Sequence, residues 1–201
     1  MNLPFSEACE RNKIPIADAL EQFLPGSARV LEIGAGTGQH AVYFTRRFAE
    51  LNWLATDRAE NLEDLRARVA SETDGRQVEV RELDVSKDHW PTGPFDAIYT
   101  ANTLHIMPFE LTPMLLEHAS DLLVPGGQLI CYGPFHDQGV HTSESNKAFD
   151  QSLKSRNPRM GIRDANEIRQ IARSHGLEQT ADLSLPANNR LLIFTKLNTN
   201  P

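Results

Sequence analysis

The sequence predicts an α/β domain with a mostly parallel, seven-stranded sheet, helices on both of its faces and an antiparallel last strand. Three observations support this fold class. From Arg29 onward, apolar runs of strand length alternate with stretches of helical spacing. One apolar run ends at Ile33 in a glycine-rich turn that leads into a helix. Polar clusters follow several expected strands, where the loops of an open parallel sheet form a crevice.

We expect the first part of the chain to form a helix, two strand–helix units and two further strands. The polar cluster 10–13 precedes the first helix and is either a helix-entry loop or part of a site. The expected elements are a helix at 16–24, a strand at 29–33, a helix at 38–50, a strand at 52–56, a helix at 61–72 and strands at 77–83 and 95–101.

The second part continues the alternation and ends in a strand pair. Pro125-Gly126-Gly127 predicts the turn between a helix and a strand. Residues 133–146 hold too many polar residues and glycines for a core element, so we expect a loop over the crevice. The expected elements are helices at 109–123, 146–155 and 164–175, a strand at 128–132, and strands at 177–183 and 190–196 that pair antiparallel.

Length and composition describe an ordinary globular protein. The chain has 201 residues, of which 40% are hydrophobic and 23% are charged, so we expect a single domain over residues 1–201. No run approaches the roughly 18 apolar residues of a membrane span, and the N-terminus does not resemble a secretion signal. Two cysteines are too few for a disulfide framework. These features favour a cytoplasmic protein.

The charge balance argues against a polyanionic substrate. The formal net charge is −7, whereas binding to nucleic acid needs a basic surface. The local exception is a basic stretch between Lys147 and Arg173, which we interpret as a solvated face of two helices. Its cations are Lys154, Arg156, Arg159, Arg163 and Arg169.

The glycine turn is spaced for a nucleotide-like ligand without a pyrophosphate. Gly34, Gly36 and Gly38 follow a G-x-G-x-G pattern, and Gln39 occupies the third glycine position of the dinucleotide fingerprint. Glu32 at the strand end would repel a phosphate and favour a cation. The alternative is a turn that only joins strand to helix.

Acidic and amide side chains follow three further strands. Asp57 lies about twenty residues after the turn, where an acid accepts hydrogen bonds from ribose hydroxyls; it would otherwise cap the next helix. Asp84 and Val85 end the next strand and either receive an adenine ring or form a turn. Asn102 follows strand 95–101 at the same rim.

Two histidines are candidate catalytic bases. His105 lies in the rim loop after Asn102, between two apolar neighbours, so a structural histidine is the alternative. His141 lies in the later polar loop with His136 and Asp137. The spacing of these three residues matches no zinc pattern, and we expect no metal site.

The motif VLEIGAGTG resembles motif I of class I S-adenosylmethionine-dependent methyltransferases, which are Rossmann-like α/β sandwiches. The resemblance extends over nearly the whole chain, through ATD at Asp57, ELDV, FDAIYTANTLH and LLVPGGQLICYGPF. More narrowly, ACERNKIPI, TANTLHIMP, HTSESNKAFDQSL and GIRD resemble the methyltransferase-like 26 family, also known as domain of unknown function 938. The resemblance implies S-adenosylmethionine as cofactor and S-adenosylhomocysteine as product.

The resemblance also implies roles for individual residues. It places Glu32, Gly34, Ala35, Gly36 and Gly38 around the methionine end of the cofactor, Asp57 at the ribose, Asp84 and Val85 at the adenine, and Asn102 at the amino-acid part. Two segments would cover the site: an N-terminal helical lid (1–28) through Arg11, Asn12 and Lys13, and a crevice segment (133–175) through Ser143, Glu144 and Asn146. Ser143 is otherwise a helix cap.

We therefore expect S-adenosylmethionine-dependent methyl transfer to a small-molecule acceptor, with His105 or His141 as base if the acceptor arrives protonated. The alternative is a non-catalytic S-adenosylmethionine-binding module that acts through a protein partner. Gln39 and Glu32 disfavour NAD-dependent oxidoreduction. Strand 95–101 lacks the Asn/Asp-Pro-Pro-aromatic motif of amino-methylating enzymes. We expect no nucleic-acid or membrane partner, and the sequence leaves the oligomeric state open.

Overall fold

The structure is a computed structural model that describes residues 3–73 and 77–198. The chain divides into two compact units, residues 1–99 and residues 100–201. Each unit is described by itself. The single domain expected over residues 1–201 stays a prediction, and residues 1–2, 74–76 and 199–201 of that range lie outside the described residues.

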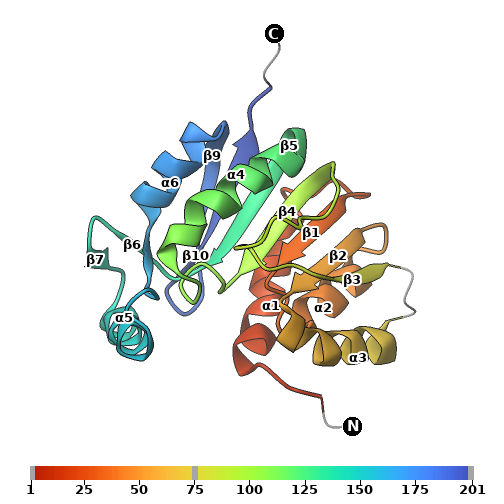
Figure 1. The fold of residues 1–201 in the computed structure, drawn as a ribbon, viewed down its shortest axis with the longest axis horizontal. Helices are drawn as coiled ribbons and strands as arrows, with labels where there is room; N and C mark the ends of the chain where they lie inside the picture. Colours follow the sequence, from red (N-terminus) through yellow and green to blue (C-terminus); the bar gives the residue numbers. More distant parts are fainter. Residues whose placement is uncertain (1–2, 74–76, 199–201) are drawn as a thin grey trace. The chain divides into compact units, whose positions relative to one another are not determined.

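The first unit is built from parallel strands and the helices that connect them (Figure 1). Its elements are α1 (Glu7–Leu20), β1 (Arg29–Ile33), α2 (Gln39–Arg47), β2 (Asn52–Asp57), the 3₁₀ turn η1 (Ala59–Asn61), α3 (Leu62–Glu72), β3 (Val78–Glu82) and β4 (Phe95–Ala101), whose last two residues belong to the second unit. β2 pairs in parallel with both β1 and β3. The predicted bounds of β1 and β4 are confirmed.

An aromatic cluster forms the centre of the first unit. The rings of Phe44, Trp53 and Tyr99 lie with centroids 5.6 to 5.8 Å apart. All three side chains are buried, and together they join α2 to β2 and β4. Large aromatic surfaces contribute strongly to stability when removed from water, so this cluster fixes the helix that follows the glycine turn.

The first helix begins nine residues earlier than the sequence predicts. α1 starts at Glu7, and the side chain of Ser6 caps it by accepting a hydrogen bond from the amide of Cys9 at 3.3 Å. Cluster 10–13 is therefore helical and not an entry loop. Pro15 lies inside α1, and this helix-breaking residue hid the continuity of the helix from sequence analysis.

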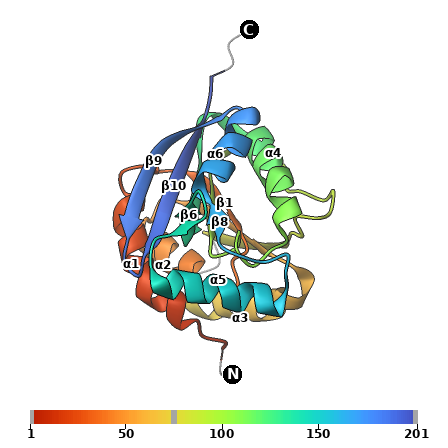
Figure 2. The same cartoon turned by 90° about the vertical axis from the view of Figure 1, so that its left-hand side faces the viewer.

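The second unit combines antiparallel strands with α4 and α6, which pack against each other. Its elements are η2 (Phe109–Leu111), α4 (Thr112–Leu122), β5 (Leu123–Gly133), β6 (Phe135–Asp137), β7 (Val140–His141), α5 (Glu144–Arg156), β8 (Arg163–Asp164), α6 (Ala165–Ser174), β9 (Leu177–Leu185) and β10 (Asn189–Lys196). β10 runs antiparallel to β5 and β9, as predicted for the last two strands. Figure 2 shows α5 as a separate helix below β6 and β8.

Two sequence predictions for this unit are wrong. β5 begins at Leu123 and runs through Pro125-Gly126-Gly127, because Gly126 adopts a left-handed φ of 79° within the strand. The expected loop 133–146 contains β6 and β7, which form a small sheet with β8 in the order β7-β6-β8. Phe135 is 1% exposed and anchors β6, so one apolar residue outweighs its polar neighbours.

Within the described residues, the larger sheet has the strand order β3-β2-β1-β4-β5-β10-β9. The predicted fold class is confirmed: a seven-stranded, mostly parallel sheet with surrounding helices and an antiparallel last strand. No helix within residues 3–73 and 77–198 is long and apolar enough to cross a membrane.

Candidate functional site

The glycine-rich turn between β1 and α2 is built from left-handed backbone. Gly34, Gly36 and Gly38 have φ angles of 77°, 55° and 76°, which residues with a Cβ rarely adopt. The amides of Gly34 and Ala35 both donate to the carbonyl oxygen of Thr56, at 3.0 and 2.9 Å. These bonds fix the turn to the end of β2.

Two of these glycines serve different purposes. A Cβ at Gly38 would lie 2.7 Å from Cδ1 of Leu65, so this glycine lets α2 begin close to α3. A Cβ at Gly36 would meet no heavy atom of the described residues within 4 Å. The backbone at Gly36 is therefore open to a ligand that lies directly against it.

Asp57, at the end of β2, faces the turn and is 7% exposed. Its Oδ2 accepts a hydrogen bond from the amide of Gly36 at 2.6 Å. Its Oδ1 accepts from the amide of Arg58 at 2.8 Å and from Nδ2 of Asn61 at 2.7 Å. An ionised carboxylate accepts about four hydrogen bonds, so this fixed group can receive one more from a ligand hydroxyl.

Glu32 is buried in β1, where its carboxyl contacts another side chain of the unit. It is 2% exposed, and its Oε2 accepts a hydrogen bond from Nε1 of Trp53 at 2.7 Å. Burial raises the pKa of Glu32 to about 8; the bond from Trp53 opposes this shift and the charge of Asp57 adds to it. The carboxyl is therefore mainly protonated at neutral pH, and without a charge it is a weaker partner for a cation than the sequence suggested.

Asp84 lies in a turn after β3. Its Oδ1 accepts hydrogen bonds from the amide and the hydroxyl of Ser86, at 3.0 and 2.7 Å, and these bonds lower the pKa of Asp84. The neighbouring Val85 is 9% exposed. The turn therefore fixes an ionised carboxylate beside an apolar side chain, which is compatible with both roles considered for this pair.

The N-terminal polar cluster packs onto α2. Asn12 is 8% exposed, and its Oδ1 lies 2.7 Å from Nε2 of His40, whose Nδ1 lies 3.2 Å from the hydroxyl of Tyr99. Burial lowers the pKa of His40 to about 4, so this hydrogen-bonded chain consists of neutral groups. Arg11 is exposed and lies 3.9 Å from Glu7. A lid role for Arg11 and Asn12 stays a prediction.

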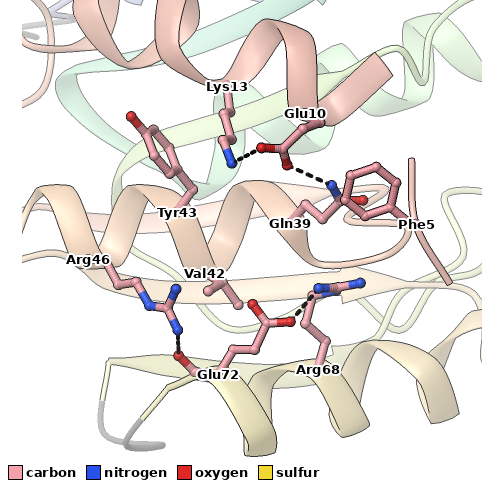
Figure 3. Close-up of a pocket in the computed structure, with 9 residues that line it drawn as sticks. All are labelled: Phe5, Glu10, Lys13, Gln39, Val42, Tyr43, Arg46, Arg68 and Glu72. Atoms are coloured by element: carbon pink, nitrogen blue, oxygen red, sulfur yellow. Dashed lines mark hydrogen bonds and ion pairs between the residues drawn. The ribbon is translucent and has the colours of Figure 1, made fainter. Parts of the chain in front are cut away.

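Lys13 lines a pocket of about 290 Å³ beside α1, α2 and α3 (Figure 3). The charged groups of this pocket pair with each other. Lys13 pairs with Glu10, which also accepts a hydrogen bond from Nε2 of Gln39 at 3.3 Å, and Arg68 pairs with Glu72. These pairs stabilise the contact between the helices, and the ligand site expected at the glycine turn stays a prediction.

In the second unit, Asn102 and His105 lie together near the end of β5. Asn102 has a φ of 58°, which is uncommon for a residue other than glycine, and its amide donates to the carbonyl of Tyr132 at 2.9 Å. A Cβ placed on Gly133 would lie 3.6 Å from Nδ1 of His105 and 3.8 Å from Oδ1 of Asn102. The two polar atoms therefore converge on one point beside the β5 backbone.

His105 is 5% exposed, and its ring contacts the ring of Phe149 edge-on, with centroids 5.4 Å apart. Neither ring nitrogen of His105 is among the buried side-chain atoms that lack a hydrogen-bond partner in the described part of the chain, whereas Nδ1 of His141 is one of them. Burial lowers the pKa of His105 to about 4, and the charges of Arg163 and Arg156 add to this effect. The imidazole is neutral at physiological pH and can accept a proton.

His141 has a different environment. Its Nε2 lies 3.4 Å from Oδ2 of Asp150, and Nδ1 of His136 lies 3.3 Å from Oδ2 of Asp164. The two histidine rings contact each other edge-on at 5.3 Å, but each faces its own carboxylate. Residues 3–73 and 77–198 contain no group of three or more side chains that could hold a metal ion.

The start of α5 holds the remaining predicted residues. Oγ of Ser143 caps the helix by accepting from the amide of Asn146 at 3.1 Å. Nδ2 of Asn146 donates to Oγ1 of Thr142 at 2.8 Å and to the carbonyl of Asn188 at 2.9 Å, which ties α5 to the turn before β10. Glu144 is exposed. Ser143 and Asn146 thus have structural roles, and a substrate role for these residues stays a prediction.

One protein family matches nearly the whole described chain. The family is described as "Protein of unknown function (DUF938)", and the match covers residues 3–196. The chain belongs to this family. The narrower resemblance to methyltransferase-like 26 stays a prediction.

The DUF938 chain is also similar to solved methyltransferase structures. An O-methyltransferase family protein from Burkholderia thailandensis has a TM-score of 0.82 at 20% identity, over 96% of this chain and 59% of that one. Human N-acetylserotonin methyltransferase, solved in complex with S-adenosylmethionine, has a TM-score of 0.81 at 16% identity, over 96% and 53%. A family 2 O-methyltransferase from Planctomyces limnophilus, solved in complex with apigenin, has a TM-score of 0.78 at 19% identity, over 94% and 60%.

These similarities establish that the DUF938 chain has the fold of class I methyltransferases. The chain spans little more than half the length of these structures. Sequence reasoning missed Asp150 and assigned a different role to Arg163. Asp150 is 4% exposed and faces His141, and Arg163 is 7% exposed and donates to backbone carbonyls. The interpretation of Arg163 as part of a solvated face is therefore wrong.

Proposed function

We propose that this protein is an S-adenosylmethionine-dependent methyltransferase that acts on a small molecule. The observation that carries the proposal is the open backbone at Gly36, with the carboxylate of Asp57 fixed 2.6 Å from the Gly36 amide. This arrangement offers a surface without a side chain beside an acceptor for hydroxyl groups, which suits the nucleoside part of the cofactor.

The chemistry of the first unit fits this cofactor better than a dinucleotide. Gln39 is 7% exposed and bonded to Ser6, so it neither opens the turn to a pyrophosphate nor supplies a positive charge. Asp84 supplies a fixed carboxylate for an exocyclic amine, and Val85 an apolar contact for a ring. Two of the similar structures are described as complexes with S-adenosylmethionine or S-adenosylhomocysteine, which supports the choice.

His105 is the residue that we propose to meet the acceptor. When bound, the cofactor would supply a methyl group on a positively charged sulfur, and the carbon–sulfur electron pair would return to sulfur as the acceptor's lone pair bonds to the methyl carbon. The role proposed for His105 is to take the acceptor's proton on a ring nitrogen, because its imidazole is neutral. The Oδ1 of Asn102 lies near the same point of the β5 backbone as Nδ1 of His105.

The acceptor is proposed to be a small molecule. Several similar structures are described as O-methyltransferases, and one was solved in complex with apigenin, which makes a hydroxyl the first acceptor to test. A general base is useful for such an acceptor because a hydroxyl must lose its proton. A cytoplasmic location stays a prediction.

Calorimetry with S-adenosylhomocysteine and with NAD tests the cofactor. We expect saturable binding of the former and none of the latter; the absence of binding to S-adenosylhomocysteine would refute the proposal. Transfer of a radiolabelled methyl group into the small-molecule fraction of a cell extract then tests catalysis. Binding without labelling above a Gly36→Asp background would instead favour a non-catalytic binding module.

A further inference from the structure

The turn that carries His105 is held through its backbone carbonyls. Nε of Arg163 donates to the carbonyl of Leu104 at 2.8 Å, and Nη2 of Arg163 donates to the carbonyl of Met107 at 2.5 Å. The carbonyl of His105 itself accepts from the amide of Gly161 at 3.0 Å. One guanidinium therefore spans the turn on both sides of His105. The planar fork of arginine suits such a pair of acceptors, and a lysine ammonium does not.

Arg163 is itself fixed in place. Its side chain is 7% exposed, and its guanidinium lies over the ring of Phe109, with 5.1 Å from Cζ to the ring centroid. Nη2 also reaches the carbonyl of Arg159 at 3.2 Å. Its backbone lies in β8, opposite Phe135 of β6. Burial lowers the pKa of Arg163, and the charges of Asp150, Glu110 and Glu167 oppose this effect, so the buried guanidinium keeps its charge while it holds the carbonyls of the turn.

The charges around His105 have one sign. Arg163 from the β8 segment and Arg156 from α5 both lower the pKa of His105, in addition to the larger effect of burial. On α5, the carboxylate of Asp150 is bonded to Lys154 at 2.6 Å and to the amide of Ile162 at 2.7 Å. The ring of Phe149, which contacts the imidazole edge-on, is uncharged. Arg163 therefore favours the unprotonated imidazole as well as a fixed turn.

We propose that Arg163 is a positioning residue for methyl transfer, which fixes His105 against the acceptor by holding both sides of its turn. The proposal rests on the proposed function of His105 as the base. It requires no contact between Arg163 and the acceptor. The guanidinium acts through the backbone of residues 104–107, and its effect on the reaction is the orientation of one imidazole ring.

Three arginine variants separate the effect of the charge of Arg163 from the effect of its hydrogen bonds to the turn. Arg163→Lys keeps the charge but cannot span both carbonyls, and Arg163→Met removes charge and bonds together. Arg159→Met is the matched control, because the Arg159 side chain is exposed and pairs with Glu110. The pKa of His105 is measured by NMR titration of the full chain, with the resonance assigned through His105→Asn. We expect a rise of roughly one unit or more in Arg163→Met, a smaller rise in Arg163→Lys, and none in Arg159→Met.

Turnover gives the second readout. We expect kcat to fall about 10- to 100-fold in Arg163→Met and less in Arg163→Lys, with KM for S-adenosylmethionine unchanged. The acid limb of the kcat–pH profile should move with the measured pKa of His105. Folded Arg163 variants that match Arg159→Met in kcat and in the pKa of His105 would overturn the proposal. The proposal would also be overturned if kcat fell equally in Arg163→Met and Arg163→Lys, in proportion to their loss of thermal stability.

Two measurements keep the proposal testable in all cases. If neither Arg163 variant folds, hydrogen exchange in the wild-type chain decides: the Nε–H of Arg163, which donates to the carbonyl of Leu104 at 2.8 Å, should be protected. Rapid exchange at this N–H would overturn the proposal. The pKa and exchange readouts need neither cofactor nor acceptor. If S-adenosylhomocysteine fails to bind, the proposed function fails, and these readouts still report on Arg163.

Discussion

The two units prepare their chemistry in opposite ways. In the first unit, the important feature is a missing side chain: the backbone at Gly36 is exposed and no described atom lies where its Cβ would be. In the second unit, the important feature is a side chain, the buried imidazole of His105, which is 5% exposed. The first surface suits a ligand that is recognised by the backbone, and the second suits a group that exchanges a proton.

This difference teaches which part of a site tolerates substitution. If the proposal is correct, binding at the glycine turn is lost when a side chain fills its open space, whereas the base is lost only when the ring of His105 or the turn that carries it changes. Binding and chemistry should therefore be separable by mutations in different units. The following predictions test this separation, from the largest effect to the smallest.

Gly36→Asp should abolish binding of S-adenosylhomocysteine, by about 100-fold or more, because the new side chain occupies the ligand's space and the left-handed φ of 55° adds strain. Calorimetry measures the loss. Gly126→Asp is the matched control, since Gly126 has a φ of 79° and also has no described atom within 4 Å of its Cβ position. Equal binding by both variants would contradict the assignment of the turn.

His105→Gln should lower kcat by about 100- to 10,000-fold and leave the affinity for S-adenosylhomocysteine unchanged, because the base is removed and the first unit is untouched. Stopped assays with a labelled methyl group measure the rate, and calorimetry measures the affinity. His89→Gln, at an exposed position, is the control. If His105→Gln also lowered the affinity for S-adenosylhomocysteine, the prediction that binding and chemistry depend on different units would be wrong.

Glu32→Gln should change how stability depends on pH. The native carboxyl, with a pKa of about 8 against an ordinary value of 4.5, holds a proton that the unfolded chain has lost, so stability falls as the pH rises through this interval. Between pH 6.5 and 8, we expect the free energy of unfolding to fall by roughly 1 to 2 kcal/mol for this reason. Glutamine keeps an acceptor for Trp53 and should remove this decline.

Urea denaturation from pH 6.5 to 8 measures the effect. The buried His40 and His105 have pKa values of about 4, so their contribution to stability is present above their ordinary value of 6.5 and is lost as the pH falls below it. The interval from pH 6.5 to 8 lies above that range. Glu63→Gln, at an exposed position of α3, is the control. An identical decline in wild type and Glu32→Gln would show that Glu32 does not titrate in this range.

Asp84→Asn should have the smallest effect. The turn with Ser86 persists because the asparagine Oδ1 still accepts, so we expect a loss of stability of about 0.5 kcal/mol or less. If Asp84 receives the adenine amine, affinity for S-adenosylhomocysteine should fall about 10-fold, as for the loss of one charge-assisted hydrogen bond. Unchanged affinity would leave Asp84 with a role in the turn alone.

The sequence predicts the first unit more completely than the second, for a physical reason. Glycine is needed where backbone adopts a positive φ, so Gly34, Gly36 and Gly38 mark the turn, and the spacing to Asp57 follows from the strand–helix–strand unit. The bounds of β1 and β4 are predicted correctly because turn residues flank their apolar runs. The start of α1 is missed because Pro15 interrupts a pattern that the helix accommodates.

The second unit depends on contacts without a local signature. Arg163 bonds to the carbonyls of Leu104 and Met107, and every residue has a carbonyl, so no spacing in the sequence could indicate this contact. The choice between a structural and a functional His105 was likewise open. The role of His105 depends on whether another group of the protein forms a hydrogen bond with its ring nitrogens, and only the three-dimensional arrangement determines this.

The bond from Trp53 to Glu32 has a practical consequence. The chain has two tryptophans, and the indole of Trp53 lies in the aromatic cluster with its N–H on a carboxyl that changes charge near neutral pH. Fluorescence of this indole is therefore an intrinsic optical reporter on the strand that leads into the glycine turn. Comparison with Trp53→Phe isolates its signal from that of Trp90, so occupancy of the turn can be followed without a dye or a label.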